Sequence, residues 1–171
     1  MQATSTVSAR TALAQSARAG KYLSFQLGTE EYAIQVLKVR EIVKIQHITA
    51  VPETPPELRG VINLRGKVIP VVDLRLKFGM PELGYGQRTC IIVVEPQRES
   101  GHAPMGIIVD EVSEVMNLAD SDIQETPDFG GGVSTPFLLG MAKVKDQVKI
   151  LLDIDQVLAT ADLKALQAAI G

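Results

Sequence analysis

Residues 55–76, PPELRGVINLRGKVIPVVDLRL, decide how this chain folds. The prolines indicate a turn that stops at Gly60, and the β-prone apolar residues that follow indicate a strand. Arg65-Gly66 then reverses the chain, because Gly66 can adopt the positive φ that a tight hairpin needs. Residues 68–72 are too apolar for either face to be fully wet. The stretch therefore predicts a β-hairpin whose second strand is at least partly in the core.

The end of this hairpin carries two further signals. Pro70 cannot donate a ladder hydrogen bond, which predicts that the second strand lies at a sheet edge or at a bulge. Asp73 follows the strand and can cap a short helix, which Gly79 would close.

Composition limits the class of protein. The 171 residues suffice for one domain or two small subdomains, and the aliphatic, Trp-free composition favours a strand-rich interior. A net charge of −3 with interspersed signs gives no reason to expect a nucleic-acid partner. The single cysteine, Cys90, predicts a reducing compartment and lies in an apolar run typical of a core strand. No apolar run is long enough to span a membrane and no secretion signal opens the chain, so we predict a cytoplasmic protein without membrane insertion.

Several more segments have strand or helix patterns. Alternation predicts a first hairpin around the turn Gly28-Thr29, and a last hairpin turning at Lys145-Asp146. Asp110-Glu111 interrupts two strands, which indicates a bulge or sharp bend. The expected strands are 22–27, 32–36, 41–48, 89–95, 105–109, 112–118, 137–144 and 147–152; the expected helical segments are 37–40, 153–159 and 160–171. The stretch 97–103 is expected to be a polar turn. The result is a mainly β fold with short helices.

The two ends differ from the middle of the chain. Residues 1–20 are rich in Ala, Ser and Thr and carry no acid. Such a segment could imitate an organellar transit peptide or form a frayed helix, but too few large apolar residues are present to dock it, so we expect a disordered tail. The predicted domain covers residues 21–159, with a C-terminal helix over 160–171.

A search for catalytic or metal-binding sets gives no coherent site. His47 and His102 are far apart without ligand spacing around them, and both are expected at the surface. The sequence 120–122, DSD, begins like a calcium loop, but the glycine and closing glutamate are misplaced. The glycines 130–132 open no helix that could bind phosphate. We therefore predict that the chain is not an enzyme and binds no metal or cofactor. The alternative is an enzyme that uses His102 and the acidic loop, and a metal-uptake measurement would test it.

Four separated blocks resemble the CheW family, adaptors that couple chemoreceptors to the histidine kinase CheA in bacterial chemotaxis. They are YLSFQLGTEEYAIQVLKVREIV from Tyr22, GVINLRGKVIPVVDLRLKFG from Gly60, MGIIVDEVSEVMNL from Met105 and VKILLDIDQVL from Val148. The resemblance implies two intertwined five-stranded SH3-like barrels, which periodicity alone does not specify.

The resemblance also implies a function and its site. A carboxylate on Glu41 and a guanidinium on Arg65 could pair, and an exposed pair contributes little stability, so recognition is a better reason for it. The family match makes Val39, Glu41, Gly60, Arg65, Val112 and Val115 candidates for a groove that binds the cytoplasmic hairpin tip of a chemoreceptor. For the apolar members a plain core role stays open.

Phe129, beside the glycine triplet, is the candidate for contact with the regulatory domain of CheA; a lid over a barrel end is the alternative. The pathway could be chemotaxis or a related one, such as twitching motility or second-messenger signalling.

Overall fold

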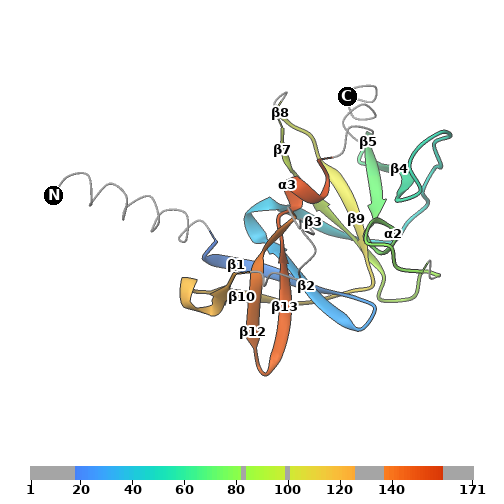
Figure 1. The fold of residues 1–171 in the computed structure, drawn as a ribbon. Coiled ribbons are helices and arrows are strands. Elements are labelled where there is room, and N and C mark those ends of the chain that lie inside the picture. Colours follow the sequence, from blue (N-terminus) through green and yellow to red (C-terminus); the bar gives the residue numbers. More distant parts are fainter. Residues whose placement is uncertain (1–17, 82–83, 99–100, 126–136, 160–171) are drawn as a thin grey trace.

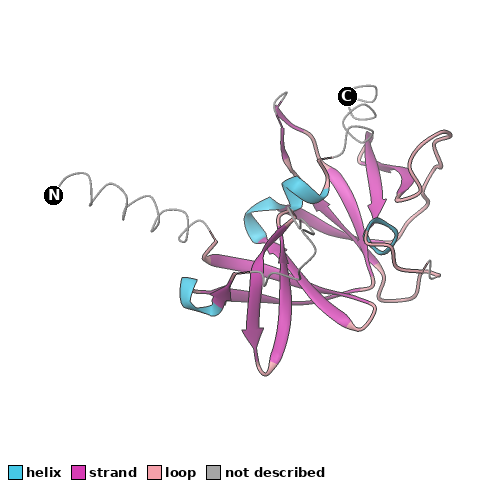
Figure 2. Cartoon of the chain, in the orientation of Figure 1, coloured by secondary structure: helices cyan, strands magenta, loops and turns pink. Residues whose placement is uncertain are grey.

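The computed structural model describes residues 18–81, 84–98, 101–125 and 137–159, and two antiparallel-rich sheets dominate it (Figures 1 and 2). The first sheet has the order β10 (Glu111–Leu118), β1 (Gly20–Leu27), β2 (Glu30–Gln35), β13 (Gln147–Leu152), β12 (Leu138–Val144), β11 (Ile123–Gln124). The second has the order β3 (Val39–Lys44), β6 (Cys90–Val94), β9 (Met105–Val109), β5 (Lys67–Asp73), β4 (Leu58–Leu64). The described residues also form short helical segments between or after the strands: η1 (Val36–Lys38), α2 (Leu74–Lys77), η2 (Asp120–Asp122) and α3 (Ile154–Val157).

The chain visits the two sheets in an intertwined order. It starts in the first sheet with β1 and β2, builds the whole second sheet, and returns for β10 to β13. A small hairpin of β7 (Gln97–Arg98) and β8 (Gly101–His102) occupies the stretch predicted as a polar turn. Figure 1 shows the two groups of strands side by side, with α3 at their junction.

Each sheet curls around its own apolar core, so both faces of most strands are covered. The interior of the first barrel is formed by Tyr22, Ala33, Met116, Leu118, Ile123, Ala142 and Leu151. The interior of the second is formed by Ile62, Ile69, Val71, Ile91, Val93 and Ile108. Val43 on the edge strand β3 and Leu64 on the opposite edge strand β4 pack against this same second core, which shows that the sheet closes on itself.

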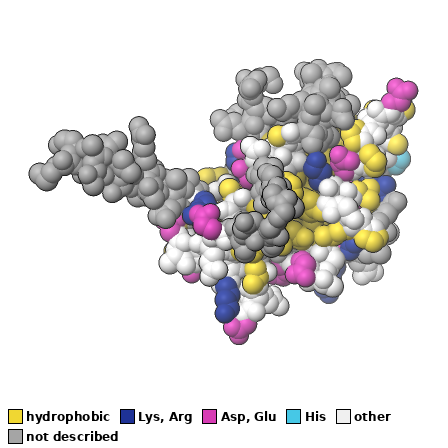
Figure 3. Space-filling model, viewed as in Figure 1, with side chains coloured by type: hydrophobic (Ala, Val, Ile, Leu, Met, Phe, Trp, Pro, Cys, Tyr) yellow, Lys and Arg dark blue, Asp and Glu magenta, His cyan; other side chains and the backbone are white. Residues whose placement is uncertain are grey.

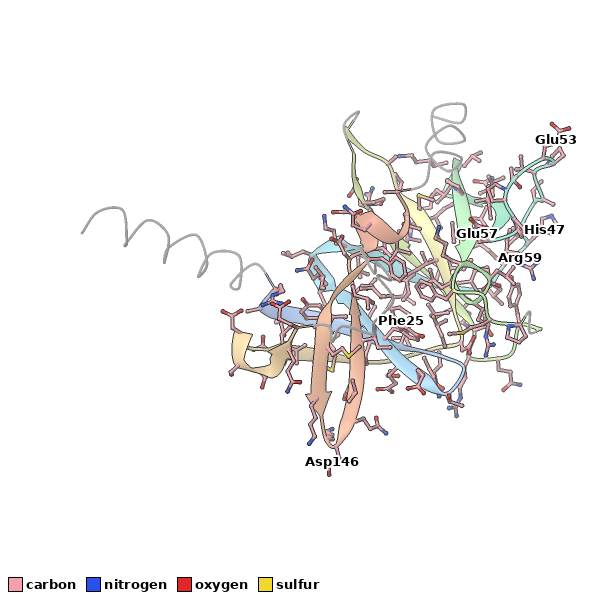
Figure 4. The ribbon with its side chains drawn as sticks, in the orientation of Figure 1. Phe25, His47, Glu53, Glu57, Arg59 and Asp146 are labelled. Carbon is pink, nitrogen blue, oxygen red and sulfur yellow. The ribbon has the colours of Figure 1, made fainter. Side chains whose placement is uncertain are left out.

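A third and larger core joins the barrels. It contains a row of stacked rings, Phe25, Tyr32, Phe78 and Phe137, with centroids 6.2, 5.7 and 5.8 Å apart in that order. Phe25 is labelled between the two groups of strands in Figure 4. Two ion pairs flank this core. Arg75 of α2 donates two hydrogen bonds to Asp110, which lies between β9 and β10. Lys38 of η1 pairs with Asp155 of α3 at 2.9 Å. The barrels are therefore packed as one unit.

The two-barrel fold that the resemblance implied is confirmed. The first sheet has six strands rather than five because the turn η2 interrupts one edge, and the two-residue β11 pairs with β12 beyond it. The last hairpin, the turn at Asp110 and the Asp73 and Asp153 caps match the sequence pattern, and both caps accept backbone hydrogen bonds.

One local prediction is wrong, and another holds in only one of its two alternatives. The strand predicted over 41–48 is β3, which begins at Val39 because a bulge between Val39 and Glu41 lets Val39 pair with Val94; the helical turn lies one residue earlier, at Val36–Lys38. β5 lies between β9 and β4, so Pro70 does not mark an edge strand, but the predicted alternative, a bulge, is found: the ladder to β4 shifts register opposite Val71 and Val72, next to Pro70. The neighbouring strand β9 begins to pair at Val71, so the missing donor of Pro70 falls where the parallel ladder has not yet begun.

Three further predictions concern residues outside the described ranges. Residues 1–17, Phe129 and the predicted helix 160–171 lie there. β1 begins at Gly20, and Arg18 before it already contacts the fold through Glu125 at 3.1 Å.

The two barrels repeat one arrangement of strands. The hairpin β4–β5 with α2 corresponds to β12–β13 with α3: both have a glycine of large positive φ near the start, two positive-φ residues at the tip and a capping aspartate. Likewise β3, VREIVK, corresponds to the segment VSEVMN in β10, and each strand carries a register shift at the same place. In this correspondence Glu41 matches Glu114.

Candidate functional site

The pair Glu41–Arg65 is the most defined polar feature at the surface of the second barrel. Arg65 Nη1 donates to Glu41 Oε2 at 2.7 Å and Nη2 donates to Oε1 at 2.6 Å, a two-pronged contact. The predicted pairing is thus formed, and it links the edge strand β3 to the tip of the β4–β5 hairpin. The hydrogen bonds from Arg65 lower the pKa of Glu41. The Arg65 side chain is still 72% exposed, so a partner protein can reach the cation.

The hairpin tip is built to hold Arg65 outward. Arg65 and Gly66 both have positive φ, 53° and 84°, as a two-residue hairpin turn requires. The side-chain oxygen of Asn63 accepts a hydrogen bond from the Gly66 N–H at 2.8 Å, which fixes the turn further. The backbone therefore presents the guanidinium in one place.

Gly60 serves the fold around the site. Its φ is 144°, and a Cβ added there would lie 2.0 Å from the carbonyl oxygen of Thr49. Thr49 and Val61 exchange backbone hydrogen bonds of 2.8 and 2.9 Å, so the loop before β4 lies directly against the strand. The backbone that approaches Gly60 is thus the chain's own.

The three predicted valines do not share one environment. Val39 and Val112 are partly buried against the core between the barrels, one from each barrel. Val115 is 59% exposed on β10. Val39 and Val112 therefore contribute to the core at the junction of the barrels, whereas Val115 lies mainly at the surface.

Sequence reasoning missed the apolar residue equivalent to Val115. Ile42 on β3 is 45% exposed, and the two residues occupy matching positions: Val115 lies opposite Leu23 and Ile42 opposite Ile92. Val68 and Val148, 47% and 53% exposed, form a second matched pair on the two hairpins. The similarity of VREIVK to VSEVMN could have revealed Ile42 from the sequence. Each barrel thus exposes a similar pair of apolar side chains.

A buried lysine was also missed. Lys149 of β13 is 3% exposed, and its Nζ lies 2.6 Å from Glu31 Oε2 and 3.2 Å from Glu114 Oε1. Burial alone would lower the pKa of Lys149, but the attraction of the two nearby carboxylates outweighs it and raises the pKa. The hydrogen bond from Lys149 likewise lowers the pKa of Glu31. These groups, with Ser113, line a cavity of about 260 Å³ at the first barrel.

The described residues offer little for chemical catalysis. Within them no group of three or more His, Cys, Asp or Glu side chains could hold a metal ion. Burial raises the pKa of the Cys90 thiol, which disfavours the nucleophilic thiolate. His47 lies in the exposed loop before β4, away from the first barrel (Figure 4). On the face in Figure 3, basic and acidic side chains are interspersed. The arrangement suits protein contacts.

The helical segments of the described residues are short. Across the described ranges, the structure contains no helix with the length and apolar character needed to cross a bilayer.

Comparison with known proteins gives a consistent answer. The family model of the CheW-like domain matches residues 21–162. The chain is 36% identical over 143 residues to the chemotaxis protein CheW of Klebsiella aerogenes, covering 84% of each chain. It is 35% identical over 150 residues to CheW of Bacillus subtilis, covering 88% of this chain and 92% of the relative.

A solved structure agrees. The scaffolding protein TtCheW from Thermoanaerobacter tengcongensis superimposes with a TM-score of 0.73 at 35% identity, over 84% of this chain and 95% of that one. Because the match spans both barrels, and because these relatives are named as chemotaxis or scaffolding proteins, the chain belongs to the CheW family of non-enzymatic chemotaxis scaffolds.

Proposed function

We propose that this chain couples the cytoplasmic hairpin tip of chemoreceptors to the regulatory domain of the histidine kinase CheA. The observation that carries the proposal is the exposed, two-pronged Glu41–Arg65 pair. A fixed guanidinium on a rigid hairpin costs little entropy to use in binding, and its carboxylate partner sets its direction. An exposed ion pair stabilises a fold weakly, so recognition is the better explanation for it.

The receptor surface in this proposal comprises Val39, Glu41, Gly60, Arg65, Val112 and Val115. Val39 of the second barrel and Val112 of the first both pack, partly buried, against the core between the barrels, and a helical receptor tip could bind along that junction. Gly60 contributes by allowing the 49–50 backbone to lie against β4, which keeps the neighbouring hairpin in place.

The kinase surface includes Phe129, for which the support is the sequence alone. A scaffold that holds receptor and kinase together raises the effective concentration of one at the other, without chemistry of its own. The chain would act in the cytoplasm and be recruited to receptor arrays through these two contacts.

The test compares two exposed arginines that each form an ion pair. Arg65→Ala removes the proposed contact, whereas Arg88→Ala removes the pair Arg88–Glu111, 2.9 Å long, whose arginine is 77% exposed. Binding of a receptor hairpin-tip fragment is measured by calorimetry, and melting temperature is measured beside it. We expect Arg65→Ala to weaken binding at least about tenfold with little change in melting, as for an interface anchor. Arg88→Ala should match the wild type.

Two results would contradict this assignment. One is equal receptor-tip affinity for the wild type and Arg65→Ala. The other is a loss of folding stability that accounts for the loss of binding. Fragments from receptors of different pathways, used in the same measurement, distinguish chemotaxis from a related signalling system.

A further inference from the structure

Glu114 occupies in the first barrel the position that Glu41 occupies in the second. Strand β10 pairs with β1 as β3 pairs with β6, and in both pairs the register shifts beside the glutamate. Val112 lies opposite Phe25 as Val39 lies opposite Val94. Glu114 therefore sits between Val112 and Val115, on the part of β10 that the proposed function assigns to the receptor.

The backbone of Glu114 is held by a buried serine. At the register shift the hydroxyl of Ser24, fully buried, donates to the Glu114 carbonyl oxygen at 3.1 Å and accepts from the Glu114 N–H at 3.1 Å. One hydroxyl thus replaces two missing ladder bonds. In the second barrel the equivalent position opposite Glu41 is Val93, which has no such hydroxyl.

The side chain of Glu114 is held by a cation that the fold does not require. Lys149 reaches Glu114 at 3.2 Å, but the matching position of the β4–β5 hairpin is occupied by Ile69, which is 2% exposed. An aliphatic residue therefore satisfies this position in the same architecture. A buried ammonium is unfavourable unless carboxylates compensate it. A lysine at this buried position is therefore explained by its contacts with the carboxylates of Glu31 and Glu114.

The consequence concerns an exposed edge. β10 ends the order of the first sheet and has a strand neighbour, β1, on only one side among the described residues. Val112 and Val115 pair with Phe25 and Leu23 of β1, but the regular ladder is interrupted between them, at Ser113 and Glu114. Without another constraint, this part of β10 would be free to shift.

We propose that Glu114, held by Lys149 and Ser24, is a positioning residue that fixes Val112 and Val115 for receptor binding. The inference rests on the proposed function. In the second barrel the corresponding carboxylate pairs with an exposed arginine, which the proposed function assigns to the receptor. In the first barrel the cation, Lys149, is buried and cannot contact the receptor, and Glu114, whose side chain is 42% exposed, anchors β10 through it.

The test uses Glu114→Ala, the conservative Glu114→Gln and the control Asn117→Ala, an exposed residue on the same strand. Affinities for the receptor tip and for the kinase regulatory domain are both measured. Glu114→Ala should bind the receptor tip about tenfold more weakly, a typical effect of a residue that acts through others. It should bind the kinase domain like the wild type. Glu114→Gln keeps an oxygen that accepts from Lys149 and should retain most of the affinity, and Asn117→Ala should retain all of it.

Amide hydrogen exchange supplies a readout independent of the receptor. Exchange at residues 112–115 should be faster in Glu114→Ala than in Glu114→Gln, with the rest of the sheet unchanged. The inference is overturned if Glu114→Ala binds the receptor as well as the wild type does, if it weakens both partners alike through unfolding, or if Glu114→Gln is as defective as Glu114→Ala. A wild-type chain that does not bind the receptor tip would instead overturn the proposed function, and this inference with it.

Discussion

Gly60 shows how one residue without a side chain can shape a binding surface. Its positive φ and its contact with Thr49 exclude a Cβ on two separate grounds. Gly140 repeats both properties in the first barrel, with φ 151° and a Cβ position 2.6 Å from the Gln124 carbonyl oxygen. The repetition indicates that each hairpin needs this close approach in order to pack its barrel edge.

Gly60→Ala is therefore expected to destabilise the fold by about 3 kcal/mol or more, because strain and overlap with backbone add together. The measurement is denaturant unfolding. Gly84→Ala is the control, since a Cβ there meets nothing within 4 Å and its φ lies outside the left-handed region. Equal stabilities of the two variants would show that the loop at Thr49 moves aside without cost.

At the scale of elements, Asp110 ties the segment between the barrels to α2 and to the first hairpin. Arg75 donates to it through Nε at 2.7 Å, and the Gly28 N–H donates at 2.8 Å. Burial by itself would raise the pKa of Asp110, but the hydrogen bonds from Arg75 and Gly28 lower it below its ordinary value.

This lowered pKa gives stability a definite dependence on pH. A depressed folded-state pKa contributes stability that is present above the unfolded pKa and lost as pH falls through the folded pKa. We expect Asp110→Asn to lower the free energy of unfolding by about 1–3 kcal/mol at neutral pH, as for a charged hydrogen bond. The gap to the wild type should narrow as the pH falls below about 4. Urea unfolding of both proteins from neutral pH to below about pH 4 tests this prediction. A difference in free energy of unfolding that does not change with pH would contradict it.

Elements with a local signal were predictable from the sequence. The turn Arg65-Gly66, the cap Asp73 and the last hairpin follow from residue types within a few positions. The start of β3 was not predictable from the sequence, because the bulge that lets Val39 pair with Val94 depends on a strand about fifty residues away. For the same reason Pro70 could not decide between an edge and a bulge, since the second neighbour of β5, β9, is distant in sequence.

At the scale of the whole molecule, the closure of each sheet could not be read from periodicity. Strands that are covered on both faces lose the apolar–polar alternation that tells which face points inward. Only the family resemblance predicted the two barrels. The pair Glu41–Arg65 was predictable from the same resemblance. The pair Glu114–Lys149 was not, because Lys149 occupies an interior position at which an apolar residue is expected.

Phenylalanines give a prediction at this scale. Three of the four, Phe25, Phe78 and Phe137, stack in the core between the barrels, and Phe129 is the fourth. Phe129→Ala should cost about 1–2 kcal/mol or more in binding the kinase domain while leaving unfolding little changed. Phe137→Ala, the matched control, should lose folding stability because its ring stacks on Phe78. If Phe129→Ala unfolds as easily as Phe137→Ala does, its ring has a structural role and the kinase contact is withdrawn.

We propose above that this chain joins receptor and kinase in one assembly. The most direct measurement is CheA autophosphorylation with receptor clusters, with and without the chain, in the presence and absence of a receptor ligand. We expect the wild type and Arg88→Ala to raise kinase activity and to make it respond to the receptor ligand, and we expect Arg65→Ala to do neither. Kinase activity that responds equally without the chain, or with Arg65→Ala in its place, would show that this chain does not couple receptor to kinase through Arg65.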